Sequence, residues 1–189
     1  MSLSWPSVAL IVVWVGSEIG LGVARRSRSS DADSLDRSSL RVLWIVITLA
    51  VTAGMFVSGR RWGVFVGPRS VWEPVGVAVI LAGLALRWWA ILSLKQAFTV
   101  DVAIAAGQRL IENGIYGVIR HPSYTGTILS FAGLGLALRN WASLAAIVIP
   151  ITAAFLYRIE VEERALRAGF GEAYEHYMRR TRRLVPFVY

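Results

Sequence analysis

The run PVGVAVILAGLALRWWAILSL at residues 74–94 decides the fold class of this chain. It carries one charged residue, Arg87. At about 1.5 Å per residue, a helix of this length would be roughly 30 Å long, which matches the hydrocarbon core of a bilayer. Its apolar residues do not alternate with polar ones, as they would in a half-buried strand. We therefore predict a membrane-spanning helix that begins at Pro74, where a missing backbone N–H costs little.

The rest of the chain is also rich in long apolar runs. Hydrophobic residues make up 56% of the sequence, there are eight tryptophans, and the mean hydropathy is +0.56. Because backbone hydrogen bonds must be satisfied internally in lipid, such runs are expected to be helices. We predict an all-α integral membrane protein, with about five transmembrane helices in a single membrane-embedded domain over residues 1–189 and no Rossmann domain. The predicted spans are residues 6–23, 40–57, 74–94, 124–138 and 142–157.

Three polar stretches separate or follow these runs. Residues 27–39 are rich in Ser, Asp and Arg and are interpreted as a loop without an assigned function. Residues 95–123 are too polar and too interrupted by glycine to span the membrane. Residues 158–177 are predicted to form an amphipathic helix, and the basic cluster at residues 179–183 indicates contact with anionic membrane lipids. The apolar positions that define this helix are Leu166, Phe170, Tyr174 and Tyr177.

The composition excludes several kinds of site. Without cysteine there can be no disulfide, thiol nucleophile or thiolate metal site, and the two histidines, His121 and His176, are too far apart in sequence to suggest a metal centre. The net charge of +8 would suit a nucleic-acid partner in a soluble protein, but here the arginines flank apolar runs. We therefore expect membrane lipids as partners, and neither nucleic acid nor metal; the oligomeric state is left open.

The distribution of basic residues predicts the orientation of the chain. Fifteen lysines and arginines lie between the first and second spans, between the third and fourth, and after the fifth, whereas four lie in the other two connections. Since cytoplasmic loops carry the excess of positive charge, the N-terminus is expected outside. Residues 95–123 and 158–189 would then face the cytoplasm together.

The polar sequence GIYGVIRHPSYTG, residues 114–126, precedes the fourth predicted span and is the first half of a candidate site. A residue before proline is kept out of the right-handed helical region, so His121 is expected in a turn at the start of that helix. Arg120 and the free backbone N–H groups of a helix N-terminus suit a carboxylate or a phosphate. Alternatively, Arg120 and His121 only contact lipid headgroups. Hydrolysis with Ser123 or Ser130 as nucleophile lacks a supporting nucleophile elbow.

The second half of the candidate site is RIEVEE, residues 158–163, where charge returns after the last apolar run. At about 100° per residue, Glu162 lies on the Arg158 face of a helix and Glu163 lies roughly 140° away from it. The two acids can therefore address different directions. A solvated helix surface is the alternative, with i,i+4 pairs Glu160–Arg164 and Glu163–Arg167.

Two charges inside the predicted spans also need partners. Glu18, in the first span, is expected to snorkel or to pair with Arg25. Arg87 should point at water, an acid or a phosphate, because an unpaired charge in an apolar helix is costly. Snorkelling and a role in the site both remain open for Arg87.

Together these motifs resemble the isoprenylcysteine carboxyl methyltransferase family. The resemblance runs from about Leu86 to the C-terminus. It rests on the Arg-His-Pro-x-Tyr-x-Gly element, the RIEVEE motif, Phe170-Gly-Glu-Ala-Tyr174 and the closing Arg183-Leu-Val-Pro186. Two positions depart from the family pattern: Gln108, where relatives often carry histidine, and Ile115, where they often carry proline. The family is similar to phospholipid N-methyltransferases and, more distantly, to membrane sterol reductases that use NADPH.

The resemblance implies a pocket for S-adenosylmethionine. Arg120 or His121 would bind the cofactor's carboxylate, and Glu162 or Glu163 its amino or ribose groups. The residues expected to line the cofactor are Tyr116, Arg120, His121, Pro122, Tyr124 and Gly126, together with these acids.

The resemblance also implies methyl transfer to the carboxylate of a prenylated cysteine, or of a similar lipidic small molecule, at the membrane surface. Arg158 is the candidate for holding that carboxylate, with Arg87 in reserve. Glu162 is, with Arg158, a candidate catalytic residue, and Glu162 or Glu163 would act as a base if the acceptor were an amine. The alternatives are a phospholipid N-methyltransferase, an NADPH-dependent membrane reductase and a non-catalytic membrane scaffold.

Overall fold

The described residues of the computed structural model, 3–24, 34–60, 63–94 and 110–186, form a helical bundle. Outside the helices they contain only two isolated bridges, Val64 with Asn140 and Ile119 with Arg182. The predicted all-helical fold is confirmed. The elements are α1 (Trp5–Ala24), α2 (Ser34–Ser58), α3 (Arg69–Leu94), the short 3-10 helix η2 (Gly114–Gly117), α4 (Pro122–Ala137), α5 (Trp141–Phe170) and α6 (Glu172–Arg180).

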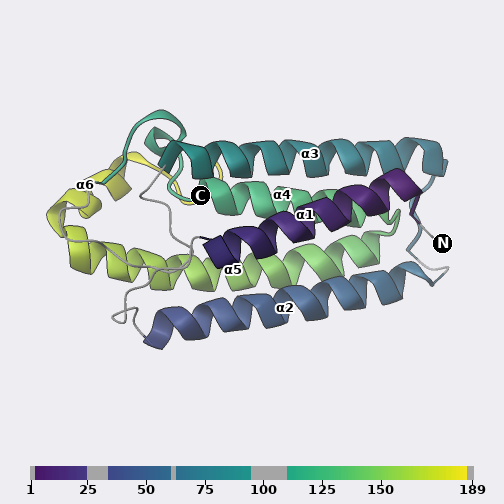
Figure 1. Ribbon diagram of the computed structural model, residues 1–189, viewed down its shortest axis with the longest axis horizontal. Helices are drawn as coiled ribbons and strands as arrows, with labels where there is room; N and C mark the ends of the chain where they lie inside the picture. Colours follow the sequence, from purple (N-terminus) through teal and green to yellow (C-terminus); the bar gives the residue numbers. More distant parts are fainter. Residues whose placement is uncertain (1–2, 25–33, 61–62, 95–109, 187–189) are drawn as a thin grey trace.

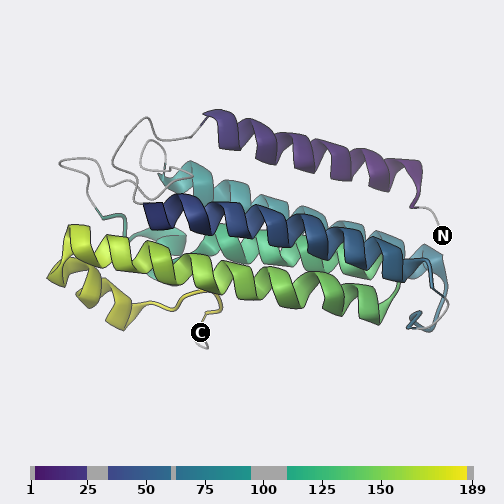
Figure 2. The ribbon, with the colours of Figure 1, turned by 90° about the horizontal axis from the view of Figure 1, so that it is seen from below.

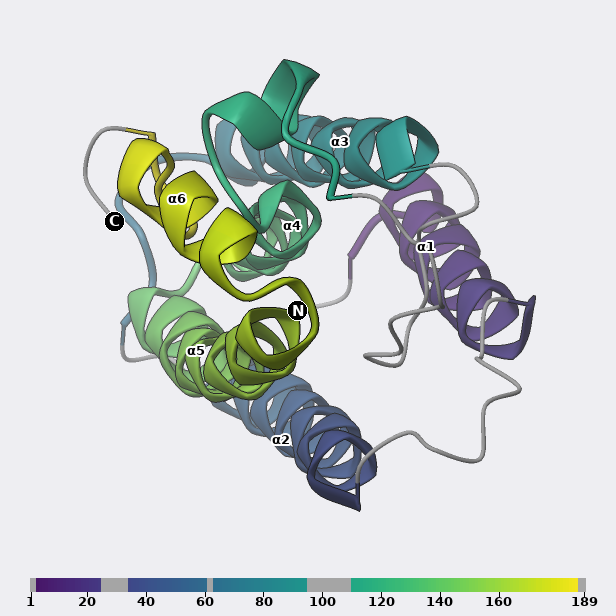
Figure 3. The same ribbon diagram turned by 90° about the vertical axis from the view of Figure 1, so that its left-hand side faces the viewer.

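The five long helices run back and forth along the long axis of the molecule (Figures 1 and 2). Viewed end-on, α4 lies between α3 and α5, α2 packs on the far side of α5, and α1 lies beside α3 (Figure 3). The start of α4, the end of α5 and all of α6 share one end of the bundle. The two predicted halves of the site are therefore at the same end.

Three of the described helices are long and apolar enough to cross a membrane: Ser38–Ser58, Arg69–Leu94 and Trp141–Phe170. The apolar helix Trp5–Leu21 is shorter, and α4 has 16 residues. Both lie alongside the three long helices. The chain is an integral membrane protein by these features, while the count of five spans stays a prediction.

Glycines bring α3 and α4 into backbone contact. A Cβ added at Gly83 would lie 2.5 Å from the carbonyl oxygen of Gly126, and one added at Gly133 would lie 2.7 Å from the carbonyl oxygen of Gly76. Small residues at these crossings let two helices approach closely in an apolar environment, where van der Waals packing replaces the hydrophobic effect. This contact fixes the start of α4, which carries the His-Pro turn, against α3.

Aromatic and polar contacts attach α1 to the rest of the bundle. Trp14 packs on Phe131 of α4, with 4.9 Å between ring centroids. At the N-terminal end of α1, the Ser4 backbone N–H and the Ser7 hydroxyl both donate to Glu73 of α3, at 2.8 and 2.6 Å. These contacts hold α1 against both α3 and α4.

Two helix starts differ from the prediction. α2 begins at Ser34, so residues 34–39 are helical and not part of the predicted loop. The helix continues there because α5 extends beside it and supplies a polar partner for Ser39, described below. α3 begins at Arg69, which places Pro74 inside the helix; the Arg69–Glu73 ion pair at i,i+4 stabilises this extra turn.

The last apolar run and the predicted tail helix also join differently. We expected one helix over 142–157 and another over 158–177, but α5 is continuous from Trp141 to Phe170. The break comes at Gly171, whose φ of 54° is readily adopted only by glycine. The charged residues at 158–163 do not interrupt α5, because they find partners on neighbouring elements. After Gly171, α6 turns to pack back toward η2 and α4 (Figure 3).

Candidate active site

A buried carboxylate, Glu163, lies where three segments of the chain meet. Its side chain has no exposed area. Arg120 Nε donates to its Oε1 at 2.8 Å, and Arg183 donates to its Oε2 through Nη2 at 2.8 Å and Nε at 3.1 Å. His121 Nε2 lies 3.4 Å from Oε1. One acid on α5 is therefore surrounded by three nitrogen-bearing side chains from the turn before α4 and from the C-terminal segment.

Backbone hydrogen bonds hold these segments together. The N–H groups of Arg120 and His121 donate to the carbonyl oxygens of Arg182 and Arg183, at 2.7 and 3.0 Å, and the N–H of Arg182 donates to Val118 at 3.1 Å. The Arg120 guanidinium also donates to the Thr181 carbonyl at 2.6 Å. The chain after α6 thus runs beside the His-Pro turn and closes this end of the site.

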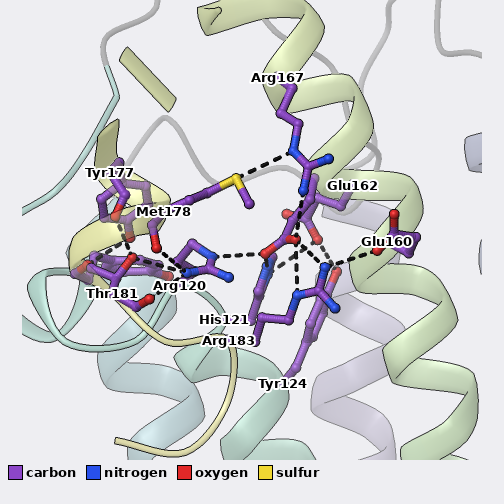
Figure 4. Close-up of polar contacts among 12 residues, drawn as sticks. Arg120, His121, Tyr124, Glu160, Glu162, Arg167, Tyr177, Met178, Thr181 and Arg183 are labelled. Carbon is purple, nitrogen blue, oxygen red and sulfur yellow. Dashed lines mark hydrogen bonds and ion pairs between the residues drawn. The ribbon is translucent and has the colours of Figure 1, made fainter. Parts of the chain in front are cut away.

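The structure gives Arg183 a different place from the one predicted. We interpreted it as part of a basic cluster in contact with lipid headgroups. Instead it bonds Glu163 and Glu160 (Figure 4). The prediction was wrong for this residue because sequence spacing shows only that arginines are clustered, and not that the segment folds back onto α5.

The second acid, Glu162, lies on the other side of His121. Its Oε2 accepts a hydrogen bond from the Tyr124 hydroxyl at 2.8 Å and lies 3.7 Å from His121 Nδ1. The rings of His121 and Tyr124 are parallel, with centroids 5.5 Å apart. The side chain of Glu162 is 26% exposed, whereas that of Glu163 is fully buried. The prediction that the two acids address different directions is consistent with this arrangement.

Arg158 lies one helical turn before Glu162 on α5 and is almost completely buried, at 1% exposure. Its Nη1 donates to the hydroxyl of Ser39 on α2 at 2.6 Å, and its charge also acts on the side chain of Tyr124. Arg158 therefore extends the polar site from the end of the bundle inward. Nothing in the sequence pointed to Ser39, which fell at the edge of the predicted loop.

Arg87 has an acid as its partner. Its Nε and Nη2 bond the two carboxylate oxygens of Glu18 at 2.6 and 2.5 Å, and its Nη1 donates to the hydroxyls of Ser123 and Thr127, each at 2.9 Å. The sequence left water, an acid or a phosphate open as the partner of Arg87, and the structure supports an acid. Glu18 therefore pairs with Arg87. Arg25, which the sequence suggested as a partner for Glu18, lies outside the described residues. Gln108, one of the two departures from the family pattern, also lies outside them.

Three other predicted cofactor residues have structural contacts. The Tyr116 hydroxyl donates to the Ala90 carbonyl at 3.2 Å, and the Tyr116 carbonyl accepts from the Tyr177 hydroxyl at 2.7 Å. Burial raises the pKa of both tyrosines, which keeps their hydroxyls protonated as donors. Pro122 is buried at the first position of α4, and Gly126 faces the backbone of α3. These residues position the turn and the helix that carry Arg120, His121 and Tyr124.

The observed contacts also test two alternative interpretations of the sequence, a solvated helix surface and a serine nucleophile. Both i,i+4 pairs occur: Arg164 lies 3.4 Å from Glu160, and Arg167 lies 3.9 Å from Glu163. The burial of Glu163 is inconsistent with a merely solvated helix surface. The serine nucleophile gains no support, because the Ser130 hydroxyl donates to the carbonyl oxygen of Gly126 at 3.0 Å and that of Ser123 accepts from Arg87.

Known proteins match this chain over most of its length. The sequence model of the isoprenylcysteine carboxyl methyltransferase (ICMT) family matches residues 76–168. A probable protein-S-isoprenylcysteine O-methyltransferase from Oryza sativa is 28% identical over 98% of this chain and 96% of its own length. Protein-S-isoprenylcysteine O-methyltransferase B from Arabidopsis thaliana is 33% identical over 66% of this chain and 65% of its own length. By these comparisons, this chain is similar to the isoprenylcysteine carboxyl methyltransferase family.

The fold agrees with that of a solved relative. The structure of a eukaryotic intramembrane Ras methyltransferase, itself an isoprenylcysteine carboxyl methyltransferase, superposes with a TM-score of 0.57 at 25% identity. The match covers 86% of this chain and 54% of that one.

The family match includes only part of the site. His121, Arg158 and Glu163 lie within residues 76–168, whereas Arg183 and Ser39 lie beyond its two ends. In this chain, the C-terminal segment and α2 therefore complete an arrangement of which the matched residues 76–168 contain only the centre.

Proposed function

We propose that this protein transfers a methyl group from S-adenosylmethionine to the carboxylate of a prenylated cysteine, or of a similar lipidic small molecule, at the membrane surface. The observation that carries the proposal is the burial of Arg158 within the bundle, one turn from the partly exposed acid Glu162. A guanidinium matches a carboxylate in geometry and charge, and the interaction is stronger where water is excluded.

The chemistry requires positioning more than proton transfer. A C-terminal carboxylate is already ionised near pH 7, so it needs no base before it attacks an electrophilic methyl group. Fixed geometry can lower a barrier by roughly 7–11 kcal/mol when the reacting groups are held in line. Arg158 would hold the acceptor carboxylate, and the surrounding helices would shield it from water.

The acids differ in their suitability for the cofactor, which supplies an electrophilic methyl group on a sulfonium centre. Both oxygens of Glu163 already accept hydrogen bonds from arginines. Among the described residues, the polar contacts of Glu162 go to Oε2. Its Oε1 can therefore accept a hydrogen bond from an amino or ribose group. We assign Glu162 to the cofactor and Glu163 to holding Arg120 and Arg183 in place.

The donors for the cofactor's carboxylate are Arg120 and His121. Arg120 is anchored by Glu163 and Thr181, and His121 lies buried between the two acids. Tyr124 would line the pocket through its ring while its hydroxyl orients Glu162. Tyr116, Pro122 and Gly126 support this surface from behind, and Arg87 does so through its pair with Glu18.

The acceptor's lipid tail would remain in the membrane while its carboxylate reaches Arg158. The N-terminus would lie outside and the active site on the cytoplasmic face, as the distribution of basic residues predicts. Single cysteines at Ser30 and Ser70, labelled in intact cells with an impermeant thiol reagent, test this orientation. Labelling at Ser70 alone is expected; labelling at Ser30 alone would place the site on the opposite face.

The activity test offers labelled S-adenosylmethionine with N-acetyl farnesylcysteine and, separately, with phosphatidylethanolamine. A methyl ester releases methanol on mild base treatment, whereas an N-methyl amine does not. Base-labile product from the prenylcysteine, lost in Arg158→Ala and retained in Arg164→Ala, is the expected result. Arg164 is the matched control because its side chain is 70% exposed and pairs only with Glu160 among the described residues.

Other outcomes would point to other functions. Base-stable label on phosphatidylethanolamine, with none on the prenylcysteine, would identify a phospholipid N-methyltransferase in which Glu162 acts as a base. Titration of the purified protein with S-adenosylhomocysteine and with NADPH separates the remaining possibilities. Binding of NADPH alone would indicate a reductase, and binding of neither would indicate a non-catalytic scaffold.

A further inference from the structure

The contact between Arg158 and Ser39 joins two helices that are far apart in sequence. The Arg158 Nη1 to Ser39 Oγ distance is 2.6 Å, and both side chains are 1% exposed. Ser39 lies near the start of α2, outside residues 76–168, which match the family model. No role in the reaction follows from the family match for this residue.

Ser39 is a polar residue at the start of the buried face that residues 39–54 of α2 turn toward the bundle. Leu43, Ala50 and Gly54 follow it at helical spacing and are buried against the bundle. Gly54 lets α2 approach α5 closely, since a Cβ there would lie 2.4 Å from the side chain of Ile147. A hydroxyl in such an interface costs free energy unless it is hydrogen-bonded. The Arg158 guanidinium donates one such bond to Ser39.

A hydroxyl constrains a guanidinium differently from a carboxylate. Arginine has five N–H donors in one rigid plane, so a bond at Nη1 restricts the orientation of the whole group. The Ser39 contact adds no negative charge, in contrast to the carboxylate of Glu18 that binds Arg87. The Ser39 hydroxyl therefore restricts the orientation of the Arg158 guanidinium, and the contact itself brings no negative charge.

We propose that Ser39 of α2 is a positioning residue for substrate binding: it holds the guanidinium of Arg158 in the orientation that receives the acceptor's carboxylate. This inference rests on the proposed function of Arg158. It makes α2 part of the active site, with Ser39 acting through Arg158.

The test compares Ser39→Thr with Ser39→Val, because these side chains have nearly the same shape and differ in the hydroxyl. Changes in packing are thereby shared between the two variants. The KM for N-acetyl farnesylcysteine should be about tenfold higher in Ser39→Val than in Ser39→Thr, as expected for the loss of a hydrogen bond to a charged group. The KM for S-adenosylmethionine should be the same in both. Ser38→Val, at an exposed neighbouring position, is the control.

A second measurement excludes a purely structural effect. In an Arg158→Lys background, the Ser39→Thr and Ser39→Val variants should have the same KM for the prenylcysteine, because the planar group that Ser39 orients is gone. Equal KM values for the two variants in the Arg158 protein, or the same tenfold difference with lysine, would overturn the role of Ser39 alone. Failure of the unaltered protein to methylate the prenylcysteine would overturn the proposed function as well.

Discussion

Removal of the carboxylate from Glu18 should destabilise the bundle, because Glu18 and Arg87 form a nearly buried ion pair between α1 and α3. Their side chains are 16% and 11% exposed, and two short hydrogen bonds join the guanidinium to the two carboxylate oxygens. Loss of one partner from a buried pair costs about 3–5 kcal/mol, because the other charge is left unpaired. Residual exposure and the hydroxyls of Ser123 and Thr127 reduce this cost for Glu18→Gln.

We expect Glu18→Gln to lower the free energy of unfolding by about 3 kcal/mol. For a chain of this size each kcal/mol corresponds to roughly 2–4 °C, so the melting temperature should fall by about 6–12 °C. Arg87→Gln should cost more, since it also removes the donors to Ser123 and Thr127. The double variant should be less destabilised than the sum of the two single variants, with a coupling of about 2 kcal/mol.

Thermal unfolding in detergent, followed through the fluorescence of the eight tryptophans, measures these changes. The Arg180–Glu112 pair is the matched control. It has the same 2.5 Å N–O distance, but its side chains are 53% and 33% exposed, so its coupling should stay below about 1 kcal/mol. Strict additivity of Glu18→Gln and Arg87→Gln would refute the view that this pair holds α1 in place.

Three further perturbations test the packing, the closing segment and the buried tyrosines. Gly126→Ala places a Cβ 2.5 Å from a backbone carbonyl of α3 and should cost at least about 3 kcal/mol in a melting assay, whereas Gly16→Ala, with nothing within 4 Å, should not. Arg183→Ala should weaken the binding of S-adenosylhomocysteine, measured by calorimetry, about tenfold. Arg182 has an exposed side chain, so Arg182→Ala should leave this binding unchanged. Equal losses of affinity in the two variants would contradict the role of Arg183. Because burial raises the pKa of Tyr177, the contribution of its hydroxyl to stability is present below pH 10 and is lost as the pH rises further. Tyr177→Phe should therefore lower the free energy of unfolding by about 1 kcal/mol at pH 7 and reduce the loss of stability at alkaline pH. An unchanged dependence of stability on pH would argue against this.

The sequence alone determined the class of structure and indicated where the candidate site lies. Apolar runs of spanning length specify membrane helices because lipid offers no partner for a free backbone group. The His-Pro turn stops regular structure just before α4, and helical spacing places Glu162 and Glu163 in different directions. All of these are local properties, encoded by neighbouring residues and a fixed period.

The pairing of distant charges was decided only by the tertiary structure. Glu18 and Arg87 are 69 positions apart, and Ser39 and Arg158 are 119 apart. Sequence showed that such charges needed partners, but only the packing of α1 on α3 and of α2 on α5 selects which ones meet. Arg183 was placed wrongly because its partner depends on the turn at Gly171 and on the backbone bonds that return the chain to α4. A side-chain contact depends on how whole helices approach one another, and that approach is set by glycines and buried faces along their full length.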